Sequence, residues 1–196
     1  MSLKEYNKKR NFKETPEPEG QAVSSGKQLS FVIQRHAATR LHYDFRLEIN
    51  GVLKSWAVPK GPSMNPSDKR LAIMVEDHPY GYRTFEGTIP KGNYGAGEVE
   101  IWDEGSYEPI EKIEGKTNDI VLRTQLHKES LKFILHGTKL KGEFALVKIK
   151  NSKDENAWLL IKHKDKHAVS KAYDAEKHTS KNSKVTAFLN EKAKKK

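Results

Sequence analysis

The chain has 196 residues, of which 36 are lysine or arginine and 26 are aspartate or glutamate, so that its formal net charge is +10. A length of this order suits one well-buried domain with tails and is short for two. The lack of cysteine excludes disulfides and thiolate metal sites. No apolar run approaches the roughly 20 residues of a membrane span, and the N-terminus lacks the apolar core of a signal peptide. We therefore expect a soluble, cytoplasmic protein whose charge favours nucleic acid or another polyanion as partner.

Residues 1–28 are polar and are interrupted by prolines and glycines. Such a composition predicts an N-terminal arm without regular structure, either a disordered leader or a flap that packs over a site. Tyr6 and Phe12 are the side chains that would hold this arm to the body of the protein.

The most informative stretch is residues 36–46, which holds two histidines, an aspartate and two arginines directly after a short apolar segment. Polar and apolar residues alternate from His42 to Ile49. This is the period of a half-buried strand, because successive side chains point to opposite faces. Asn50 and Gly51 then predict a type I′ hairpin turn, with residues 52–58 as the returning strand.

A two-residue turn fixes the register of this hairpin. The pairs on the apolar face are Ile49 with Val52, Phe45 with Trp56 and Tyr43 with Val58. On the other face Arg46 lies opposite Ser55 and Asp44 lies opposite Ala57, which leaves space beside the charged side chains. Because two imidazoles, a carboxylate and a guanidinium converge there, we predict a metal and anion site rather than a solvated polar face.

Further short strands follow, separated by turn signals. The strand that begins at Arg70 has period two, and the residues expected on one of its faces are Arg70, Ala72, Met74, Glu76 and His78. Later strands are predicted within residues 98–102, 131–135, 142–147 and 158–162. Many short strands with turns between them predict a mainly β fold, either an antiparallel sandwich or a closed barrel.

We divide the chain into an arm at residues 1–28, a β domain at 29–165 and a Lys-rich, mostly flexible tail at 166–196. Residues 185–195 have the pattern of a frayed helix. A basic tail either adds electrostatic affinity for phosphates or serves only solubility, and the sequence leaves both open.

His36, His42 and Asp44 supply two imidazoles and a carboxylate, a set of three ligands that leaves coordination positions open for water and substrate. This set suits Mn, Fe, Co, Ni or Zn. Such an ion polarises a phosphoryl oxygen or lowers the pKa of a bound water.

The neighbouring residues suit phosphate chemistry. Arg46 and Arg70 carry planar cations that match phosphate oxygens. His78 can serve as general acid or base or donate to the phosphate, and Glu76 can orient an arginine or a histidine. These residue types together indicate cleavage of a phosphate ester. No serine lies in the context of a serine-hydrolase nucleophile.

At these residues the sequence resembles a known family, the 3′-phosphoesterase module of the bacterial end-joining DNA ligase D, over about residues 9–162. The motifs that carry the resemblance are residues 34–36, 41–48, 51–62, 70–72, 75–79, 85–87, 89–90 and 94–97. The resemblance implies a compact antiparallel β-barrel in a single domain. It also narrows the metal to Mn²⁺, with other divalent transition metals such as Co²⁺ as alternatives.

The resemblance further implies an enzyme that heals DNA 3′ ends. The family removes a 3′-terminal ribonucleoside and hydrolyses the resulting 3′-phosphate to a 3′-hydroxyl. The expected substrates are primer–template 3′ ends that carry a ribonucleotide or a 3′-phosphate. DNA ligase and polymerase are expected to act in trans, and the protein is expected to be a monomer without membrane partners.

Roles carried over from the family fall on matching positions of this chain. They are His36, His42 and Asp44 as metal ligands, Arg46, His78 and Tyr82 as phosphate-binding residues, Arg70 and Glu76 as required supporting residues, and Arg10 and Glu17 as active residues of the arm. Asn11 departs from the family, which usually has aspartate there. Loss of that charge is expected to weaken one of the two activities or the contact of the arm with the site.

Two other functions compete with this one. A basic nucleic-acid-binding module with a degenerate site would explain the net charge, the Lys-rich tail and Asn11. A phosphatase for small metabolites would share the chemistry but leave the basic surface unexplained. The complete polar set favours the enzyme, since a degenerate domain has no reason to keep it. Its members are His36, His42, Asp44, Arg46, Arg70 and His78.

Overall fold

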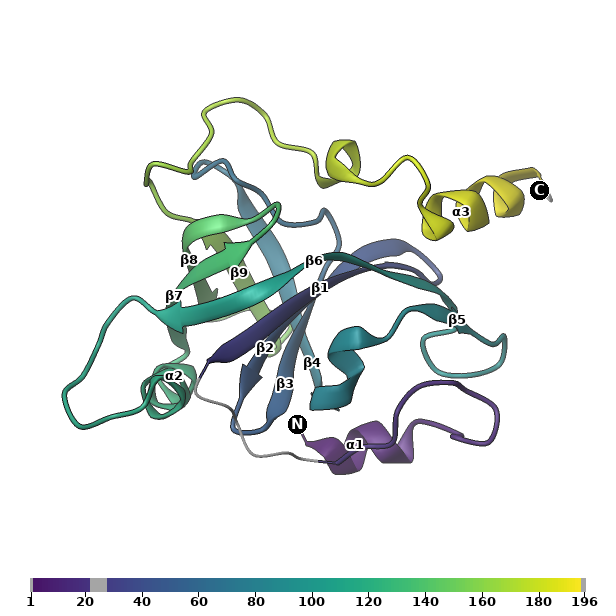
Figure 1. The fold of residues 1–196 in the computed structure, drawn as a ribbon, viewed down its shortest axis with the longest axis horizontal. Coiled ribbons are helices and arrows are strands. Elements are labelled where there is room, and N and C mark those ends of the chain that lie inside the picture. The colour runs from purple at the N-terminus through teal and green to yellow at the C-terminus, as the bar shows by residue number, and fades with distance from the viewer. Residues whose placement is uncertain (1, 22–27, 195–196) are drawn as a thin grey trace.

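The computed structural model describes residues 2–21 and 28–194. In this part of the chain nine strands form one antiparallel sheet (Figure 1). The strands are β1 (Leu29–Ala37), β2 (Leu41–Ile49), β3 (Val52–Val58), β4 (Lys69–Pro79), β5 (Gly87–Ile89), β6 (Gly97–Pro109), β7 (Ser130–Gly137), β8 (Lys141–Lys148) and β9 (Ala157–Lys162).

The sheet closes into a barrel. Its strand order is β1-β2-β3-β4-β9-β8-β7-β6-β5, and β6 also pairs with β1. Eight strands therefore form the ring, while β5 pairs with the first residues of β6 and stays outside it. Closure leaves no strand of the ring with an unpaired edge. Of the two architectures left open by the strand pattern, the closed antiparallel barrel is confirmed.

Aromatic and aliphatic side chains fill the interior of the barrel. The ring centroid of Phe45 lies 6.0 Å from that of Phe133, which in turn stacks on Phe144 at 6.4 Å. Trp56 meets Trp158 edge to face at 5.8 Å. All five side chains are buried, so burial of this surface is the main favourable contribution to folding.

The β2–β3 hairpin has the predicted turn and register. Asn50 and Gly51 have φ angles of 57° and 73°, which are the two positive values that a type I′ turn requires. The observed pairs include Ile49 with Val52, Phe45 with Trp56, Tyr43 with Val58, Arg46 with Ser55 and Asp44 with Ala57. Asp44 and Arg46 therefore lie on the outer face of the barrel.

Strand β4 departs from the predicted alternation. Ser55 lies opposite Val75, whereas Leu53 lies opposite His78, so that the one residue between them on β3 faces two residues of β4. This is a β-bulge, and it reverses the facing of the residues beyond it. His78 therefore shares the outer face with Ser55, while Arg70 stays on the inward face. The prediction that Arg70 and His78 share one face is wrong.

Short helices lie outside the ring. They are α1 (Leu3–Lys8), α2 (Asn118–His127) and α3 (Lys184–Lys194), with 3₁₀ turns η1 (Tyr80–Thr84) and η2 (Ala175–His178). No regular structure is expected in the arm from the sequence, but the Glu5 carboxylate accepts from the Ser2 backbone N–H and stabilises the start of α1. Helix α3 lies where a frayed helix is predicted. No helix of the described chain is long and apolar enough to span a membrane.

We predict that Phe45→Ala lowers the free energy of unfolding by about 3–5 kcal/mol, because it leaves a cavity among the packed rings. Leu71→Ala is the matched control, since Leu71 is 45% exposed, and should change stability by no more than about 0.5 kcal/mol. Urea unfolding followed by tryptophan fluorescence measures both. Equal losses for the two variants would contradict the position of Phe45 in the core.

Candidate active site

Three potential metal ligands meet on the outer face of β1 and β2. His36 lies directly opposite His42 in the antiparallel pair, so their side chains share a face, and Asp44 follows His42 by one strand period. The His36 Nδ1 and His42 Nε2 atoms lie 3.5 and 3.6 Å from the two carboxylate oxygens of Asp44. All three ligand atoms lie within 4.8 Å of one another.

Backbone carbonyls fix the tautomers of both histidines. The Nε2 atom of His36 lies 2.8 Å from the Gly95 carbonyl oxygen, and the Nδ1 atom of His42 lies 3.0 Å from that of Arg40. A carbonyl only accepts, so these nitrogens carry the hydrogens. The lone pairs of the other two nitrogens then point at the Asp44 side. Metal-binding histidines are usually oriented in this way.

Arg46 stabilises the charge of Asp44. Its Nη2 donates to Asp44 Oδ2 at 2.9 Å, its Nη1 to Ser55 Oγ at 2.9 Å and its Nε to Gln34 Oε1 at 2.6 Å. Burial alone would raise the pKa of Asp44, but Arg46 and the two histidines outweigh it and hold that pKa well below its usual value. Asp44 is therefore an anion, as a metal ligand must be.

His78 and Tyr82 form the second part of the site, beside Arg46. The ring centroids of His78 and Tyr82 are 4.8 Å apart, and the Arg46 guanidinium lies 4.9 Å from the Tyr82 ring. His78 Nδ1 lies 2.9 Å from the Glu76 carbonyl oxygen, and its Nε2 lies 3.2 Å from Arg10 Nη2. Since arginine only donates, Nε2 accepts. Burial and the charges of Arg46 and Arg10 hold the pKa of His78 well below its usual value, so the ring is neutral.

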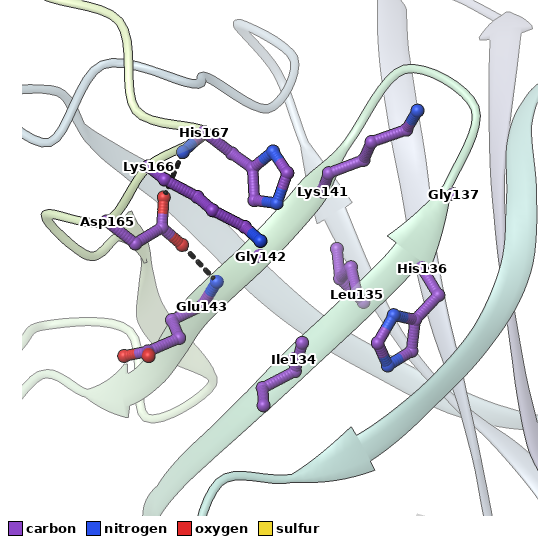
Figure 2. A pocket seen from close by; sticks show the side chains of 10 residues that line it. All are labelled: Ile134, Leu135, His136, Gly137, Lys141, Gly142, Glu143, Asp165, Lys166 and His167. Atoms are coloured by element: carbon purple, nitrogen blue, oxygen red, sulfur yellow. Dashed lines mark hydrogen bonds between the residues drawn. The ribbon is translucent and has the colours of Figure 1, made fainter.

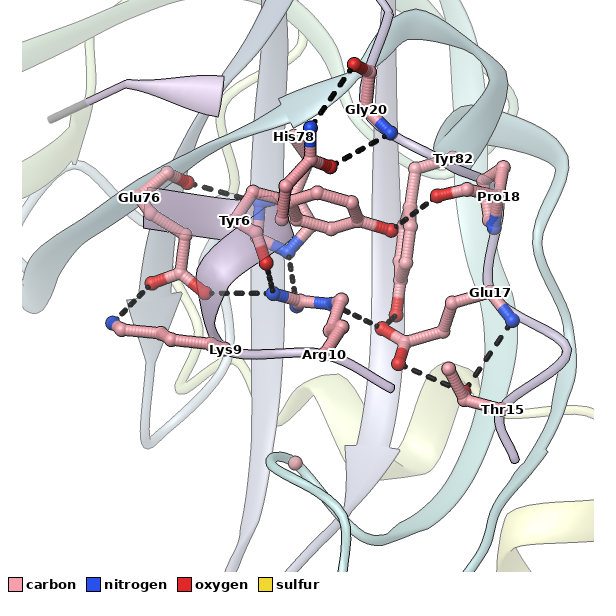
Figure 3. A network of polar contacts seen from close by, with 12 residues as sticks. Tyr6, Lys9, Arg10, Thr15, Glu17, Pro18, Gly20, Glu76, His78 and Tyr82 are labelled. Carbon is pink, nitrogen blue, oxygen red and sulfur yellow. Dashed lines mark hydrogen bonds and ion pairs between the residues drawn. The ribbon is translucent and has the colours of Figure 1, made fainter. Parts of the chain in front are cut away.

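The N-terminal arm covers this part of the site through Arg10 (Figure 3). Arg10 Nε donates to Glu17 Oε1 at 2.8 Å and its Nη1 to Glu76 Oε1 at 3.2 Å. The guanidinium also lies 3.7 Å from the centre of the Tyr6 ring. The Arg10 side chain is only 4% exposed. Of the two arm residues expected to be active, Arg10 thus contacts His78 directly, and Glu17 is linked to His78 through Arg10.

Glu17 and Glu76 complete the network. Glu17 accepts from the hydroxyl groups of Tyr82 and Thr15, each at 2.9 Å. Glu76 accepts from Lys9 Nζ at 3.0 Å. Burial would raise the pKa of Glu76, but its hydrogen bonds, including those from Lys9 and Arg10, outweigh burial and lower it. The described part of the arm is therefore held against the barrel mainly by buried ion pairs.

Comparison with known proteins assigns the chain to a family. A family model described as the DNA Ligase D 3′-phosphoesterase domain matches residues 34–148. The chain belongs to this family. The match includes the three potential metal ligands, Arg46, His78 and Tyr82. It confirms the resemblance that the sequence motifs indicate.

The similar proteins are much longer than this chain. The chain is 47% identical over 170 residues to the multifunctional non-homologous end joining protein LigD of Pseudomonas aeruginosa, covering 86% of this chain and 19% of that protein. It is 43% identical over 169 residues to the multifunctional non-homologous end joining DNA repair protein LigD of Mycobacterium tuberculosis, covering 80% of this chain and 21% of that protein. The chain thus spans about a fifth of the length of these relatives.

Arg70 does not join the other predicted residues of the candidate site. Its Nη2 donates to Asp68 Oδ2 at 3.0 Å and to the Tyr173 carbonyl oxygen at 2.8 Å. The bulge in β4 is the reason, because it turns Glu76 and His78 outward while Arg70 keeps the inward facing. Any effect of Arg70 on the site must therefore pass through other residues.

Asn11 also lies apart from the site's described contacts. Its side-chain oxygen accepts from the Lys13 backbone N–H at 3.3 Å, and its carbonyl oxygen accepts from the backbone N–H groups of Glu14 and Thr15. The residue therefore shapes the turn after α1. The expected weakening by Asn11 stays a prediction.

Two residues that orient the candidate site were not predicted from the sequence. Gln34 accepts from Arg46 and donates to the Tyr82 and Phe85 carbonyl oxygens at 3.0 and 2.8 Å. Gln34 lies two residues before His36, and residues two apart on a strand share a face, so this spacing could have identified Gln34 as a neighbour of the site. Gly95 holds His36 through a loop that is remote in sequence, and no local pattern shows this contact.

A separate groove of about 710 Å³ lies over β7 and β8 and is distinct from the candidate site (Figure 2). Histidine and lysine side chains line it, together with Glu143 and Asp165. The Asp165 carboxylate already accepts from the backbone N–H groups of Glu143 and His167. Within residues 2–21 and 28–194, the only clustered set of three metal-binding side chains is that of β1 and β2.

We predict that Glu17→Gln releases the arm. The substitution keeps the shape of the side chain but leaves the buried Arg10 guanidinium without this carboxylate. The expected loss is about 3 kcal/mol of local stability, or about 100-fold faster amide exchange across residues 3–20. Hydrogen exchange read by mass spectrometry measures it.

Glu19→Gln is the control for the arm, because Glu19 is exposed and only two residues away. It should leave exchange unchanged. If both variants exchange alike, the Arg10–Glu17 pair does not hold the arm.

Proposed function

We propose that this domain is a metal-dependent phosphoesterase that heals DNA 3′ ends. It removes a 3′-terminal ribonucleoside and hydrolyses the 3′-phosphate that remains to a 3′-hydroxyl. The observation that carries the proposal is the convergence of His36 Nδ1, His42 Nε2 and an Asp44 carboxylate oxygen within 4.8 Å. Membership in a family described by its 3′-phosphoesterase activity supports it.

The donor set fits a divalent transition metal. Two imidazole lone pairs and one ionised carboxylate suit Mn²⁺ and also Co²⁺. The resemblance favours Mn²⁺. Such an ion, when bound, supplies Lewis-acid chemistry at the phosphoryl group. Three protein ligands leave further positions for water and substrate.

Arg46 and Arg10 would supply the positive charge that draws a phosphate to this site. They approach His78 and Tyr82 from two sides, and both guanidinium groups are almost fully buried, where their charge is screened less than in water. Arg46 also orients Asp44. These residues therefore favour an anion beside the three ligands.

His78 and Tyr82 are each held by a side chain of the arm. His78 Nε2 accepts from Arg10, so the neutral His78 ring orients that guanidinium. The Tyr82 hydroxyl donates to Glu17. Burial and Glu17 raise the pKa of Tyr82 well above its usual value, which keeps the hydroxyl a neutral donor. Their contact with the scissile phosphate stays a prediction.

The relatives' descriptions favour double-strand break repair as the setting. Both name non-homologous end joining. We propose primer–template 3′ ends as substrate, with a polymerase and a ligase using the healed end in trans. The cytoplasmic location and the monomeric state stay predictions.

We predict that His42→Ala lowers both activities at least about 100-fold, more than outer-shell changes at metal sites usually cost. The assay uses 5′-labelled primer–template DNA that ends in a 3′-phosphate or in one 3′ ribonucleotide, with Mn²⁺ or with EDTA. EDTA should abolish both reactions of the unaltered protein. DNA binding should survive the substitution.

His136→Ala is the matched control, because this side chain is 50% exposed and lies on β7. It should keep full activity. If the unaltered protein binds DNA but converts neither substrate with any divalent ion, the proposal fails and the binding-module alternative holds.

We also predict that protons compete with the metal at His42. Burial lowers the pKa of His42, but the hydrogen bond and charge of Asp44 outweigh burial and raise it. A metal needs the neutral ring, so the Mn²⁺ concentration for half-maximal activity should rise by up to about tenfold for each pH unit below that pKa. Electron paramagnetic resonance of free Mn²⁺ between pH 8 and pH 6 gives a second readout. A Mn²⁺ affinity that does not change with pH would contradict competition between protons and the metal at His42.

A further inference from the structure

The segment after the barrel is basic and fixed in place. Residues 166–194 hold seven lysines against three acidic residues. They lie beyond residue 148, where the family match ends. A mostly flexible tail is expected from the sequence, whereas in the structure described residues of this segment contact Arg35 of β1, Tyr43 of β2 and Glu100 of β6.

Arg35 is the centre of these contacts. Its side chain is 2% exposed. Its Nε and Nη2 donate to the two carboxylate oxygens of Glu176 at 2.9 and 2.6 Å, and the Tyr43 hydroxyl donates to the same carboxylate. A bidentate pair of this kind fixes orientation as well as distance. The segment around η2 is therefore held against the end of the barrel.

The start of α3 is held by the same guanidinium. Arg35 Nη1 donates to Ser183 Oγ at 3.0 Å and to Thr186 Oγ1 at 3.1 Å, and it pairs with Glu100 of β6 at 3.1 Å. Val185 is fully buried beside them. Because Arg35 directly precedes His36, these bonds set the position of α3 relative to the candidate metal ligands.

Helix α3 brings Lys192 to the rim of the candidate site. Lys192 Nζ donates to the Ala38 carbonyl oxygen at 3.3 Å, in the turn between β1 and β2. The same turn supplies the Arg40 carbonyl oxygen that holds His42. Figure 1 shows α3 beside this end of β1 and on the opposite side of the barrel from α2. Lys184, Lys192 and Lys194 are exposed.

We propose that α3 and the β1–β2 turn bind the phosphate backbone of the DNA duplex that leads to the 3′ end in the site. The inference rests on the proposed function. Exposed lysines bind phosphates as point charges and carry no sequence information, which suits an enzyme that meets ends of any sequence. Because Lys192 lies at the rim, α3 is placed to meet the duplex, while the potential ligands of β1 and β2 meet its terminus.

The test compares two triple variants of the full chain that lose the same charge. The first is Lys184→Gln/Lys192→Gln/Lys194→Gln. The control is Lys116→Gln/Lys128→Gln/Lys132→Gln, on exposed lysines around α2. Substrates are a 3′-phosphorylated primer–template and a 3′-phosphorylated dinucleotide, both with Mn²⁺. Duplex binding is measured separately in EDTA by fluorescence anisotropy.

The α3 variant should raise KM for the primer–template about tenfold at low salt and reduce the slope of log KM against log salt by about 2 to 3, one unit for each lost phosphate contact. Its kcat and its turnover of the dinucleotide should stay unchanged, and the control should change KM less than twofold. Anisotropy should show the same loss of duplex affinity.

Equal effects of the two triple variants would overturn the inference, as would an equal loss on the dinucleotide. Failure of the proposed function looks different. In that case the unaltered protein converts neither substrate, while the anisotropy comparison between the two variants still reports on α3.

Discussion

His36 and His42 are directly opposite residues of two antiparallel strands, and the rest of the candidate site takes its position from that pairing. The same alternation that sends them outward with Asp44 sends Tyr43 and Phe45 into the barrel. A slip of one residue would reverse every side chain of β2 and bury its charges. The hydrophobic core and the polar site therefore specify the same register, and neither can change alone.

Three buried arginines extend this order to segments far away in the sequence. Arg46 orients Asp44, Arg10 joins the arm to Glu17 and Glu76, and Arg35 joins the C-terminal segment to the barrel. Burying such charges carries a desolvation cost that their attraction only partly offsets, so they are weak evidence for stability. What they supply is geometry. Each guanidinium fixes several partners at defined angles, which a hydrophobic contact does not do.

The sequence was sufficient wherever structure is local. Asn50 and Gly51 determine a turn, the turn determines the hairpin register, and the register brings the ligand set to one face. The bulge in β4 was not predictable from period two, because it depends on how β3 pairs with both ends of β4, and Arg70 was misplaced for that reason. Packing of the arm over the site was one of the two alternatives left open, but helix α1 was missed because it has only six residues, and the ion pairs that dock the arm join side chains far apart in the sequence. Closure of the barrel required the pairing of β1 with β6, strands separated by most of the motif-bearing sequence.

The short strand β5 has a consequence for how the folded protein behaves at high concentration. Every strand of the ring has a neighbouring strand on both sides, so among the strands of the described chain β5 alone has a neighbour on one side only. That strand is three residues long, begins at Gly87 and is followed by Pro90, which has no N–H to donate. An edge this short gives an incoming chain too few hydrogen bonds to extend the sheet. The barrel is thereby protected against edge-to-edge self-association without charged gatekeeper residues on the strand itself.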